Sequence, residues 1–408
     1  MISLTEATQI IKHHLPTPQV ELLALKDSSG YYLAEELTAP ELLPGFNNSA
    51  MDGYAVALPE LMKDQHELSL QIVGESRAGV PYRQPLEPGT AVRISTGAFV
   101  PDRSDLVVKV EDTSEIDGKV KIKRVPEIGS NIRYRGEEVK AGDPIAQPHQ
   151  LISPAMIAWL ASFGVTEVPV FRKPSVALLT TGEELVEYTD QPGPGQIRNS
   201  NQVFGTHFLR LFGIDPVISE RIGDSLGETM EGLERAREAA DLILVSGGVS
   251  VGEHDHVKAA AEKIGFSRQF WKVSQKPGKP LYFATSNETL LFGLPGNPVS
   301  AMVNTVYHIL PILRALRGAR PVYPEGIPVR LADELAIKKS RRTRFLMVRL
   351  VGETSQGVCH VKPVSHQASH MISGVVESDG IIVVPAEATG YPSGESLTMF
   401  RFPWRERL

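Results

Sequence analysis

Residues 241–258, DLILVSGGVSVGEHDHVK, place glycines and charged side chains directly after an apolar run. The run Leu242–Val245 predicts a buried strand of a parallel sheet. Gly247 and Gly248 follow it, and glycines let a backbone turn tightly and approach a ligand closely. Because backbone N–H groups at the start of a following helix attract phosphate-like anions, this segment predicts a phosphate site.

Acidic and histidine side chains continue the same segment as Glu253, His254, Asp255 and His256. A hard cation such as Mg²⁺ takes carboxylate oxygens as ligands and bridges them to phosphate oxygens. We therefore predict that Asp255 lies at a joint phosphate and metal site. The two histidines lack a third ligand at a sensible spacing, which favours a solvated surface role over a zinc site.

Three further turns of the same region carry charged side chains. Glu183 and Glu184 in TTGEEL are expected to begin a helix, where the helix dipole alone explains them about as well as a function does. Asp224 follows a predicted strand, and capping of the next helix is an equally good explanation. Lys276 and Lys279 in KPGKP set two cations on one rigid loop, which suits an oxyanion better than an ordinary exposed turn.

A fourth turn, GLPGNPVSA, leads from an apolar run into a helix with Pro298 at its first position. The helix start near Ser300 is a second place where an anion is expected. A capping role for Gly296 and Asn297 is the structural alternative.

Outside this region the polar signals are weaker when taken one by one. Asp52 in NNSAMDGYA is better explained by a β-turn, and Thr96 in ISTGA is similar. Arg342 and Arg344 lie at the entry of a predicted C-terminal strand. A guanidinium binds oxyanions bidentately, but basic strand ends also keep surfaces soluble. Ser373 in SHMISG lies in a small polar turn without a compelling signal of its own.

Composition limits the class of protein. The 408 residues predict two to four domains, and 42% hydrophobic with 22% charged residues fit a globular chain with a core. The formal net charge of −6 argues against a general nucleic-acid binder. Cys359 is the single cysteine, so there is no internal disulfide, and a plain strand or core role is favoured over a nucleophile. With no signal-peptide pattern and no apolar run near ~18 residues, we expect a cytoplasmic protein that does not bind membranes.

The elements that must position these residues fall into four predicted domains. The fold class is α/β plus β modules in a multidomain chain. A split α-containing domain comprises 1–43 and 135–173, with an inserted all-β module at 44–134, a doubly wound, mainly parallel α/β domain at 174–318 and a small C-terminal β-barrel at 319–408.

Helices within the predicted α/β domain follow from periodicity and end signals. They cover NQVFGTHFLRLFG, residues 226–239, and a segment from Asn297 that ends before Gly318 and is kinked by Pro311. In such folds ligands bind at the carboxyl ends of the strands, where the glycine-containing turns gather.

Taken together, the motifs resemble those of the molybdopterin molybdenumtransferases, the MoeA type that also forms the E domain of gephyrin. The matching stretches, in order from about residue 40 to 303, are NNSAMDGYA, ISTGA, RGEE at Arg135–Glu138, TTGEEL, SGGVSVGEHD, KPGKP and GLPGNPVSA. Glu138 stands where an Asp is usual in the family, and Arg344 where an acidic residue is expected.

The resemblance implies an elongated homodimer with four domains per chain and an α/β domain similar to the adenylyltransferase that makes the substrate. It implies that molybdate is combined with adenylylated molybdopterin, with Mg²⁺, to release AMP and molybdenum cofactor. Molybdopterin adenylyltransferase and downstream molybdenum cofactor enzymes are the implied partners. The alternatives are a relative that adenylylates molybdopterin or cleaves another dinucleotide, and a non-catalytic scaffold or pterin-binding protein of the same fold.

Residue roles carried over from the resemblance fall into four groups. Asp255, Glu184 and Asp224 would form the metal and phosphate end, and Lys276 and Lys279 would hold the oxyanion as catalytic residues. Asp52, with Thr96 and Glu138, would reach the α/β pocket of the other subunit from the β module. The remaining substrate-binding residues would be Gly247, Gly248, Ser250, Pro295, Pro298, Ser300, Arg342 and Ser373.

Overall fold

The structure is a computed structural model, and it describes residues 1–59, 68–250, 255–353 and 358–405. The chain divides into two compact units, one comprising residues 1–35, 148–154 and 167–408 and the other residues 36–147 and 155–166. The boundaries of the four predicted domains stay a prediction.

A six-stranded sheet forms the centre of the first unit. Its order is β16 (Ile218–Ile222), β13 (Val176–Thr181), β17 (Leu242–Ser246), β21 (Thr289–Leu294), β20 (Tyr282–Ser286) and β18 (Ser267–Trp271). The first four strands are parallel to one another, and the pairings of β21 with β20 and of β20 with β18 are antiparallel. The mainly parallel sheet expected from the apolar strand sequences is confirmed. Its register aligns Thr180 with Ser246 and Ser246 with Leu294, so the carboxyl ends of three strands lie at one edge.

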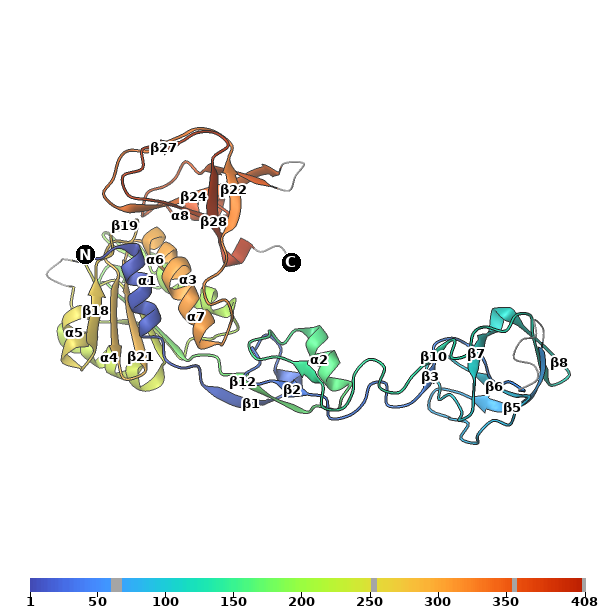
Figure 1. Cartoon of the computed structure of the whole chain (residues 1–408). Helices are drawn as coiled ribbons and strands as arrows, with labels where there is room; N and C mark the ends of the chain where they lie inside the picture. The colour runs from blue at the N-terminus through green and yellow to red at the C-terminus, as the bar shows by residue number, and fades with distance from the viewer. Residues whose placement is uncertain (60–67, 251–254, 354–357, 406–408) are drawn as a thin grey trace. The chain divides into compact units, whose positions relative to one another are not determined.

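Helices cover both faces of this sheet (Figure 1). One face carries α1 (Leu4–His13), α3 (Ser200–Arg210), α6 (Pro298–Asn304) and α7 (Leu310–Leu316), and the other carries α4 (Leu226–Ala239) and α5 (Val257–Lys263). A π-helical turn, Thr305–Ile309, joins α6 to α7 just before Pro311. Proline has no N–H for the carbonyl four residues earlier, and the widened turn accommodates that loss.

The α6–α7 helix is a core element. Residues Pro298–Leu316 are long and apolar enough to cross a membrane by length and composition, and 83% of the apolar window is buried inside the protein. Burial of this extent is typical of the central helix of an α/β domain.

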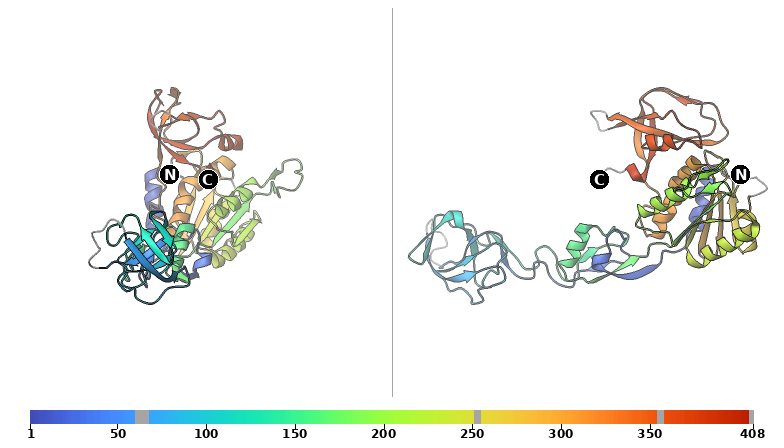
Figure 2. Two further views of the ribbon diagram at one scale, coloured as in Figure 1. Left: turned by 90° about the vertical axis from the view of Figure 1, so that its right-hand side faces the viewer. Right: turned by 180° about the vertical axis from the view of Figure 1, so that it is seen from behind.

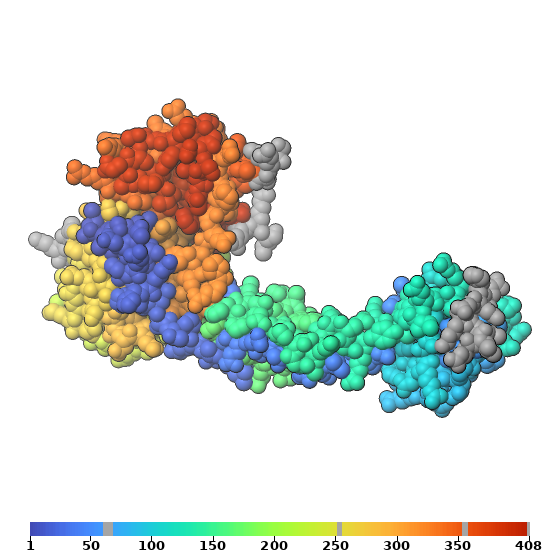
Figure 3. Space-filling view, viewed as in Figure 1, coloured from blue at the N-terminus to red at the C-terminus, as the bar shows by residue number. Residues whose placement is uncertain are grey.

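The N-terminal helix α1 packs on the α/β core, although we grouped residues 1–43 with the flanking segment 135–173. Its Ser3–Glu6 capping box is formed, with the Ser3 N–H donating to Glu6 Oε2 at 2.7 Å. Ala7 and Ile11 are buried in the same cluster as Val176. Figure 3 shows these first residues, in blue, lying against the α/β domain.

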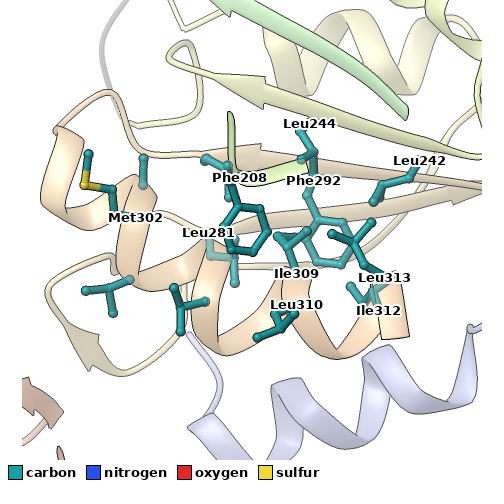
Figure 4. Packing of buried hydrophobic residues seen from close by; sticks show 14 of the residues in the cluster. Phe208, Leu242, Leu244, Leu281, Phe292, Met302, Ile309, Leu310, Ile312 and Leu313 are labelled. Atoms are coloured by element: carbon teal, nitrogen blue, oxygen red, sulfur yellow. The ribbon is translucent and has the colours of Figure 1, made fainter. Parts of the chain in front are cut away.

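The aromatic core under this helix layer is closely packed (Figure 4). Phe292 has no exposed surface, and its ring stacks on Phe283 with centroids 4.4 Å apart.

We expect Phe292→Ala to lower the free energy of unfolding by about 3–5 kcal/mol, because the neighbouring strands cannot fill the cavity that the removed ring leaves. Tyr188→Ala, at a residue 60% exposed, is the matched control and should change it by less than about 0.5 kcal/mol. Thermal and denaturant unfolding of both variants measure the difference, and equal values for the two would contradict this packing.

A closed five-stranded barrel follows the α/β domain and confirms the predicted C-terminal β-barrel. Its strands are β22 (Ile327–Leu331), β24 (Thr343–Glu353), β25 (Cys359–Pro363), β26 (Gly380–Val384) and β28 (Ser396–Arg401), with closure through β24 and β26. The short strand β19 (Gln275–Lys276) extends from the α/β domain and pairs in parallel with β24. Helix α8 (Ile372–Glu377) and the pair β23 (Leu335–Ala336) and β27 (Gly390–Tyr391) complete this part.

Shorter pairings complete the first unit. Strand β1 (Val20–Ala24) pairs with β12 (Glu167–Phe171), and β14 (Leu185–Val186) pairs with β15 (Ile197–Arg198). The first pair brings the chain that enters the second unit alongside the chain that leaves it.

The second unit contains the predicted β module, whose strands can be followed in the left view of Figure 2. The sheet order is β7 (Leu106–Lys109), β4 (Gly53–Ala57), β6 (Thr90–Ile94), β5 (Leu68–Ser76), β9 (Lys119–Ile122) and β8 (Thr113–Ile116). A turn at Asp117–Gly118 joins β8 to β9, with both residues at positive φ. Smaller elements of this unit are β2 (Leu37–Thr38) with β11 (Pro144–Ala146), β3 (Asn48–Ser49) with β10 (Ile132–Arg133), and helix α2 (Pro154–Ala161).

Candidate active site

A cavity of about 670 Å³ opens at the carboxyl ends of β13, β17 and β21. Eight of the predicted site residues line it: Glu184, Asp224, Gly247, Gly248, Ser250, Asp255, Pro295 and Pro298. The strand register explains this convergence, since Gly182, Gly247 and Pro295 each follow the last residue of an aligned parallel strand. The volume is within the range of sites that enclose a nucleotide-sized ligand.

The two glycines after β17 form a tight turn against β13. Gly247 and Gly248 have φ of +100° and +64°, and a Cβ on Gly247 would overlap the Thr181 carbonyl. The Gly247 N–H is engaged within the sheet, because it donates to the Leu294 carbonyl at 3.1 Å. Helix α5 begins only at Val257. The glycines therefore bring backbone close to the cavity without a helix start directly behind them.

Asp224 is held in the cavity by β13. The Thr181 hydroxyl donates a short hydrogen bond to its Oδ1. Capping was the structural alternative for Asp224, but the N-cap of α4 is Ser225, whose Oγ accepts from the Glu228 N–H at 3.2 Å. The carboxylate is thus one residue ahead of the cap and lines the cavity instead.

Glu183 and Glu184 do not begin a helix, so that prediction is wrong. β13 ends at Thr181, the Leu185 N–H donates to the Gly182 carbonyl, and the chain enters strand β14. Pairing of β14 with β15, the next strand along the chain, overrides the local helical signal. Removal of the helix also removes the dipole explanation for Glu184, whose side chain reaches the cavity.

Three carboxylates, those of Glu184, Asp224 and Asp255, therefore line one cavity. Among the described residues, no group of three or more acidic, histidine or cysteine side chains is gathered closely enough to hold a metal ion alone. Magnesium usually binds one or two carboxylates and completes its shell with substrate phosphates and water. The donor set fits such a shared site. Glu253 and His254 lie outside the described residues.

Residues of the 197–201 segment also line the cavity, and we did not single them out from the sequence. The Asn201 amide donates to Ser246 Oγ and to the Gly296 carbonyl, both at 2.8 Å, and so joins two of the motif turns. Asn199 caps α3 and donates to Thr180 Oγ1 at 2.8 Å. In the sequence, a polar run before an amphipathic helix indicates only a helix cap. His370 also lines the cavity, from the C-terminal part of the chain, and no local sequence pattern predicts that position.

The residues predicted to hold an oxyanion form a second group that does not line this cavity. Lys276 and Lys279 are exposed, and Ser300 is buried in the first turn of α6. Pairing of β19 with β24 places Lys276 opposite Arg344, two residues after Arg342. The Val299 N–H donates to the Ser369 carbonyl at 3.1 Å, which ties the start of α6 to the loop before α8.

Arg342 and Ser373 lie on the barrel side of this second group. The Arg342 N–H donates to Ser340 Oγ at 3.1 Å, and the Ser373 hydroxyl lies 3.3 Å from His366 Nδ1. Arg344 donates to the Lys338 carbonyl within its own strand entry. The guanidinium of Arg344 is thereby engaged in the barrel, which leaves Arg342 as the arginine to test.

Asp52 and Thr96 meet in the β module. The Thr96 N–H and hydroxyl both donate to Asp52 Oδ1, at 2.6 and 3.0 Å, and both residues are exposed. Glu138 is also exposed, and its backbone N–H donates to the Leu43 carbonyl. A simple turn at Asp52–Gly53 would not require a threonine from the end of another strand. The contact between Asp52 and Thr96 therefore favours a functional role over the turn explanation.

The two hydrogen bonds from Thr96, first from the N–H and then from the hydroxyl, hold the pKa of Asp52 below its ordinary value. Because they favour the ionised form, their stabilisation is present above the ordinary aspartate pKa and is lost as pH falls through the lowered value. We expect Thr96→Val to raise the pKa of Asp52 part of the way back, since the backbone donor remains. Carboxyl NMR titration of the two proteins measures this, and an unchanged titration would contradict the contact.

Fold and cavity define a multidomain protein built around a nucleotide-sized site in an α/β domain. Family models match residues 2–164 as the MoeA N-terminal region (domain I and II), 177–315 as a probable molybdopterin binding domain, and 328–401 as the MoeA C-terminal region (domain IV). The molybdopterin molybdenumtransferase of Haemophilus influenzae is 35% identical, over 98% of this chain and 99% of its own. That of Bacillus subtilis is 32% identical over 97% and 93%.

Solved structures agree over the same length. The molybdopterin biosynthesis MoeA protein of Pyrococcus horikoshii matches with a TM-score of 0.81 at 25% identity, covering 98% of both chains. A second structure of that protein matches with a TM-score of 0.82 at 23% identity and shows the same fold. The chain therefore belongs to the molybdopterin molybdenumtransferase family of the MoeA type.

Proposed function

We propose that this chain, as an enzyme of molybdenum cofactor biosynthesis, inserts molybdate into adenylylated molybdopterin and releases AMP and molybdenum cofactor. The enzyme class is that of its full-length relatives. The observation that carries the finer proposal is the convergence of Glu184, Asp224 and Asp255 on one cavity at the strand ends.

Charge supports a role for Mg²⁺ in this proposal. The phosphoanhydride of an adenylylated pterin is anionic, and three carboxylates lining its cavity would repel it. A divalent cation would reverse the sign of the local charge and stabilise the charge that develops as the bond breaks. Glu184, Asp224 and Asp255 would hold that cation, and Thr181 would orient Asp224 through its hydroxyl.

The chain's other residues would bind and position the two substrates. Gly247 and Gly248 line the cavity, so their backbone would contact a phosphate there, and Ser250 with the Pro295–Pro298 turn would enclose it. Lys276 and Lys279, with Ser300, Arg342 and Ser373, would bind molybdate as an oxyanion. One water adds across the phosphoanhydride as AMP leaves. Positioning of the substrates and stabilisation of the developing charge would supply most of the catalysis.

Asp52, Thr96 and Glu138 would act in a homodimer. We propose that the β module of one subunit contributes them to the α/β cavity of its partner, so that each active site is shared. A protein of this class would work in the cytoplasm, receive its substrate from molybdopterin adenylyltransferase and hand its product to molybdenum cofactor enzymes.

Reconstitution of a cofactor-free molybdenum enzyme tests the proposed function. Purified chain, adenylylated molybdopterin, molybdate and Mg²⁺ should restore activity to that enzyme. Removal of divalent cations with EDTA should lower the rate by about tenfold or more, and added Mg²⁺ should restore it. Activation that is independent of molybdate or of this chain would contradict the proposal.

A further inference from the structure

A buried polar network lies behind the KPGKP loop. Its side chains belong to the α/β domain and do not line the cavity described above. Gln275 and Asn304 have no exposed surface, and His308 is 3% exposed. The Gln275 amide group Nε2 donates to Asn304 Oδ1 at 2.7 Å and to the Gly278 carbonyl at 3.1 Å. His308 Nε2 lies 3.0 Å from Gln275 Oε1. Three side chains from a loop and a helix are thus linked in one chain of hydrogen bonds.

The backbone carbonyls fix the direction of every hydrogen bond in this network. Asn304 Nδ2 donates to the carbonyls of Ser300 and Gly278, at 2.9 and 3.3 Å, so Asn304 Oδ1 must accept from Gln275. Gln275 then turns its Oε1 toward His308, which requires a proton on His308 Nε2. Burial lowers the pKa of His308 to about 3, so the ring is neutral at physiological pH and supplies that proton as an N–H donor.

The network connects the separate segments that carry the predicted oxyanion residues. Gln275 and Gly278 belong to the loop that contains Lys276 and Lys279, and the Ser300 carbonyl belongs to the first turn of α6. The backbone of Gln275 also pairs with Thr343 of β24, directly after Arg342. One buried residue, Gln275, therefore joins the lysine loop to α6 through its side chain and to the barrel through its backbone.

The loop has no room for a side chain at position 278, where Gly278 lies against the network. Its φ is +86°, and a Cβ there would overlap the amides of Asn304 and Gln275. A fully satisfied buried network is rigid, because leaving any of its polar groups unpaired is costly. Lys276 and Lys279 are exposed and long, so a defined oxyanion site depends on a fixed backbone beneath them.

We propose that Gln275, Asn304 and His308 are positioning residues for molybdate, which hold the lysine loop in register with the Ser300 turn and the entry of β24. This inference rests on the proposed function in one respect, namely that the loop binds the metalate. It adds three residues that act through others and do not touch either substrate.

Two matched glutamine substitutions test the inference. Gln275→Met keeps the length of the side chain but removes every hydrogen bond, whereas Gln269→Met does the same at a hydrogen-bonded glutamine of β18 away from the loop. Calorimetric titration of the full-length protein with molybdate should show binding about tenfold weaker for Gln275→Met and unchanged for Gln269→Met. In the AMP-release assay, half-saturation by molybdate should rise by the same factor while that by adenylylated molybdopterin stays within about twofold.

Substitutions at His308 give a second comparison that does not depend on Gln275→Met folding. His308→Gln retains an N–H donor toward Gln275 Oε1 and should bind molybdate like the wild type, whereas His308→Leu removes the donor and should weaken binding several-fold. Folded His308→Leu with wild-type affinity would overturn the inference, and so would equal loss for both substrates in Gln275→Met. A wild type that binds molybdate but releases no AMP would refute the proposed function and leave this inference standing.

Discussion

Replacing Asp255 with alanine is expected to lower molybdate-dependent AMP release by at least about a hundredfold. Asp255 lines the cavity together with Glu184 and Asp224, at the strand end from which the glycine turn departs. Under the proposed function it holds a divalent cation against the phosphoanhydride. Without it, the cation is bound more weakly, and the negative charge that develops as AMP leaves is less stabilised.

Asp190→Ala is the matched control for this experiment. Asp190 is an exposed acidic residue of the same domain that does not line the cavity. Asp190→Ala should leave the rate of AMP release within about twofold of the wild-type rate. A higher Mg²⁺ concentration should recover part of the activity of Asp255→Ala, because the remaining carboxylates still attract the ion. An Asp255→Ala protein that keeps more than half of the wild-type rate would contradict the assignment of the metal end.

Asp52→Ala is expected to inactivate the enzyme to a similar extent, and the activity should return when this variant is mixed with Asp255→Ala. In a shared-site homodimer, a mixed dimer has one site with both aspartates intact and one with neither. Random exchange of subunits makes half of the dimers mixed, so the mixture should reach about a quarter of the wild-type activity. The result depends on Asp52 and Asp255 of different subunits serving the same site.

Refolding or co-expression of the two variants with different affinity tags provides the mixed dimers. Tandem purification should then give a preparation with about half of the wild-type activity, since every dimer has one intact site. As a control, Asp255→Ala mixed with Asp224→Ala should not recover activity, because both residues belong to the same subunit's cavity. Recovery in that control, or none with Asp52→Ala, would contradict the shared site.

The elements that sequence analysis predicted well have local start and end signals. Helix α4 spans Leu226–Ala239 as expected, and α6 begins with Pro298 directly after its cap at Asn297. The strand before Gly247 was readable because four apolar residues in a row suit a strand buried on both faces. Each of these depends on residues within one turn or one strand.

The parts that sequence analysis missed depend on residues far apart in the chain. Glu184 has a helical context locally, but Leu185 pairs with Ile197 and makes the segment a strand. The Gly247 N–H donates to the Leu294 carbonyl on the neighbouring strand, a contact that no local pattern indicates. His370 reaches the cavity from a loop more than a hundred residues after Asp255, for which no local pattern exists.

Candidate site residues divide in the same way. Motif turns at the strand ends placed eight predicted residues on one cavity, because a parallel sheet collects such turns at one edge. The Thr96 hydroxyl that contacts Asp52 and the Gln275–Asn304–His308 network were beyond prediction. Pairing between buried polar groups is set by tertiary packing, and neither composition nor periodicity encodes it.

The most direct test of the central claim is AMP release by the purified wild-type chain from adenylylated molybdopterin with Mg²⁺, in the presence and absence of molybdate. We expect AMP and molybdenum cofactor to appear in equal amounts only when molybdate is added. Release of AMP at the same rate without molybdate would identify a simple pyrophosphate hydrolase, and no release under either condition would indicate a binding or scaffold protein. Either of these results would contradict the account.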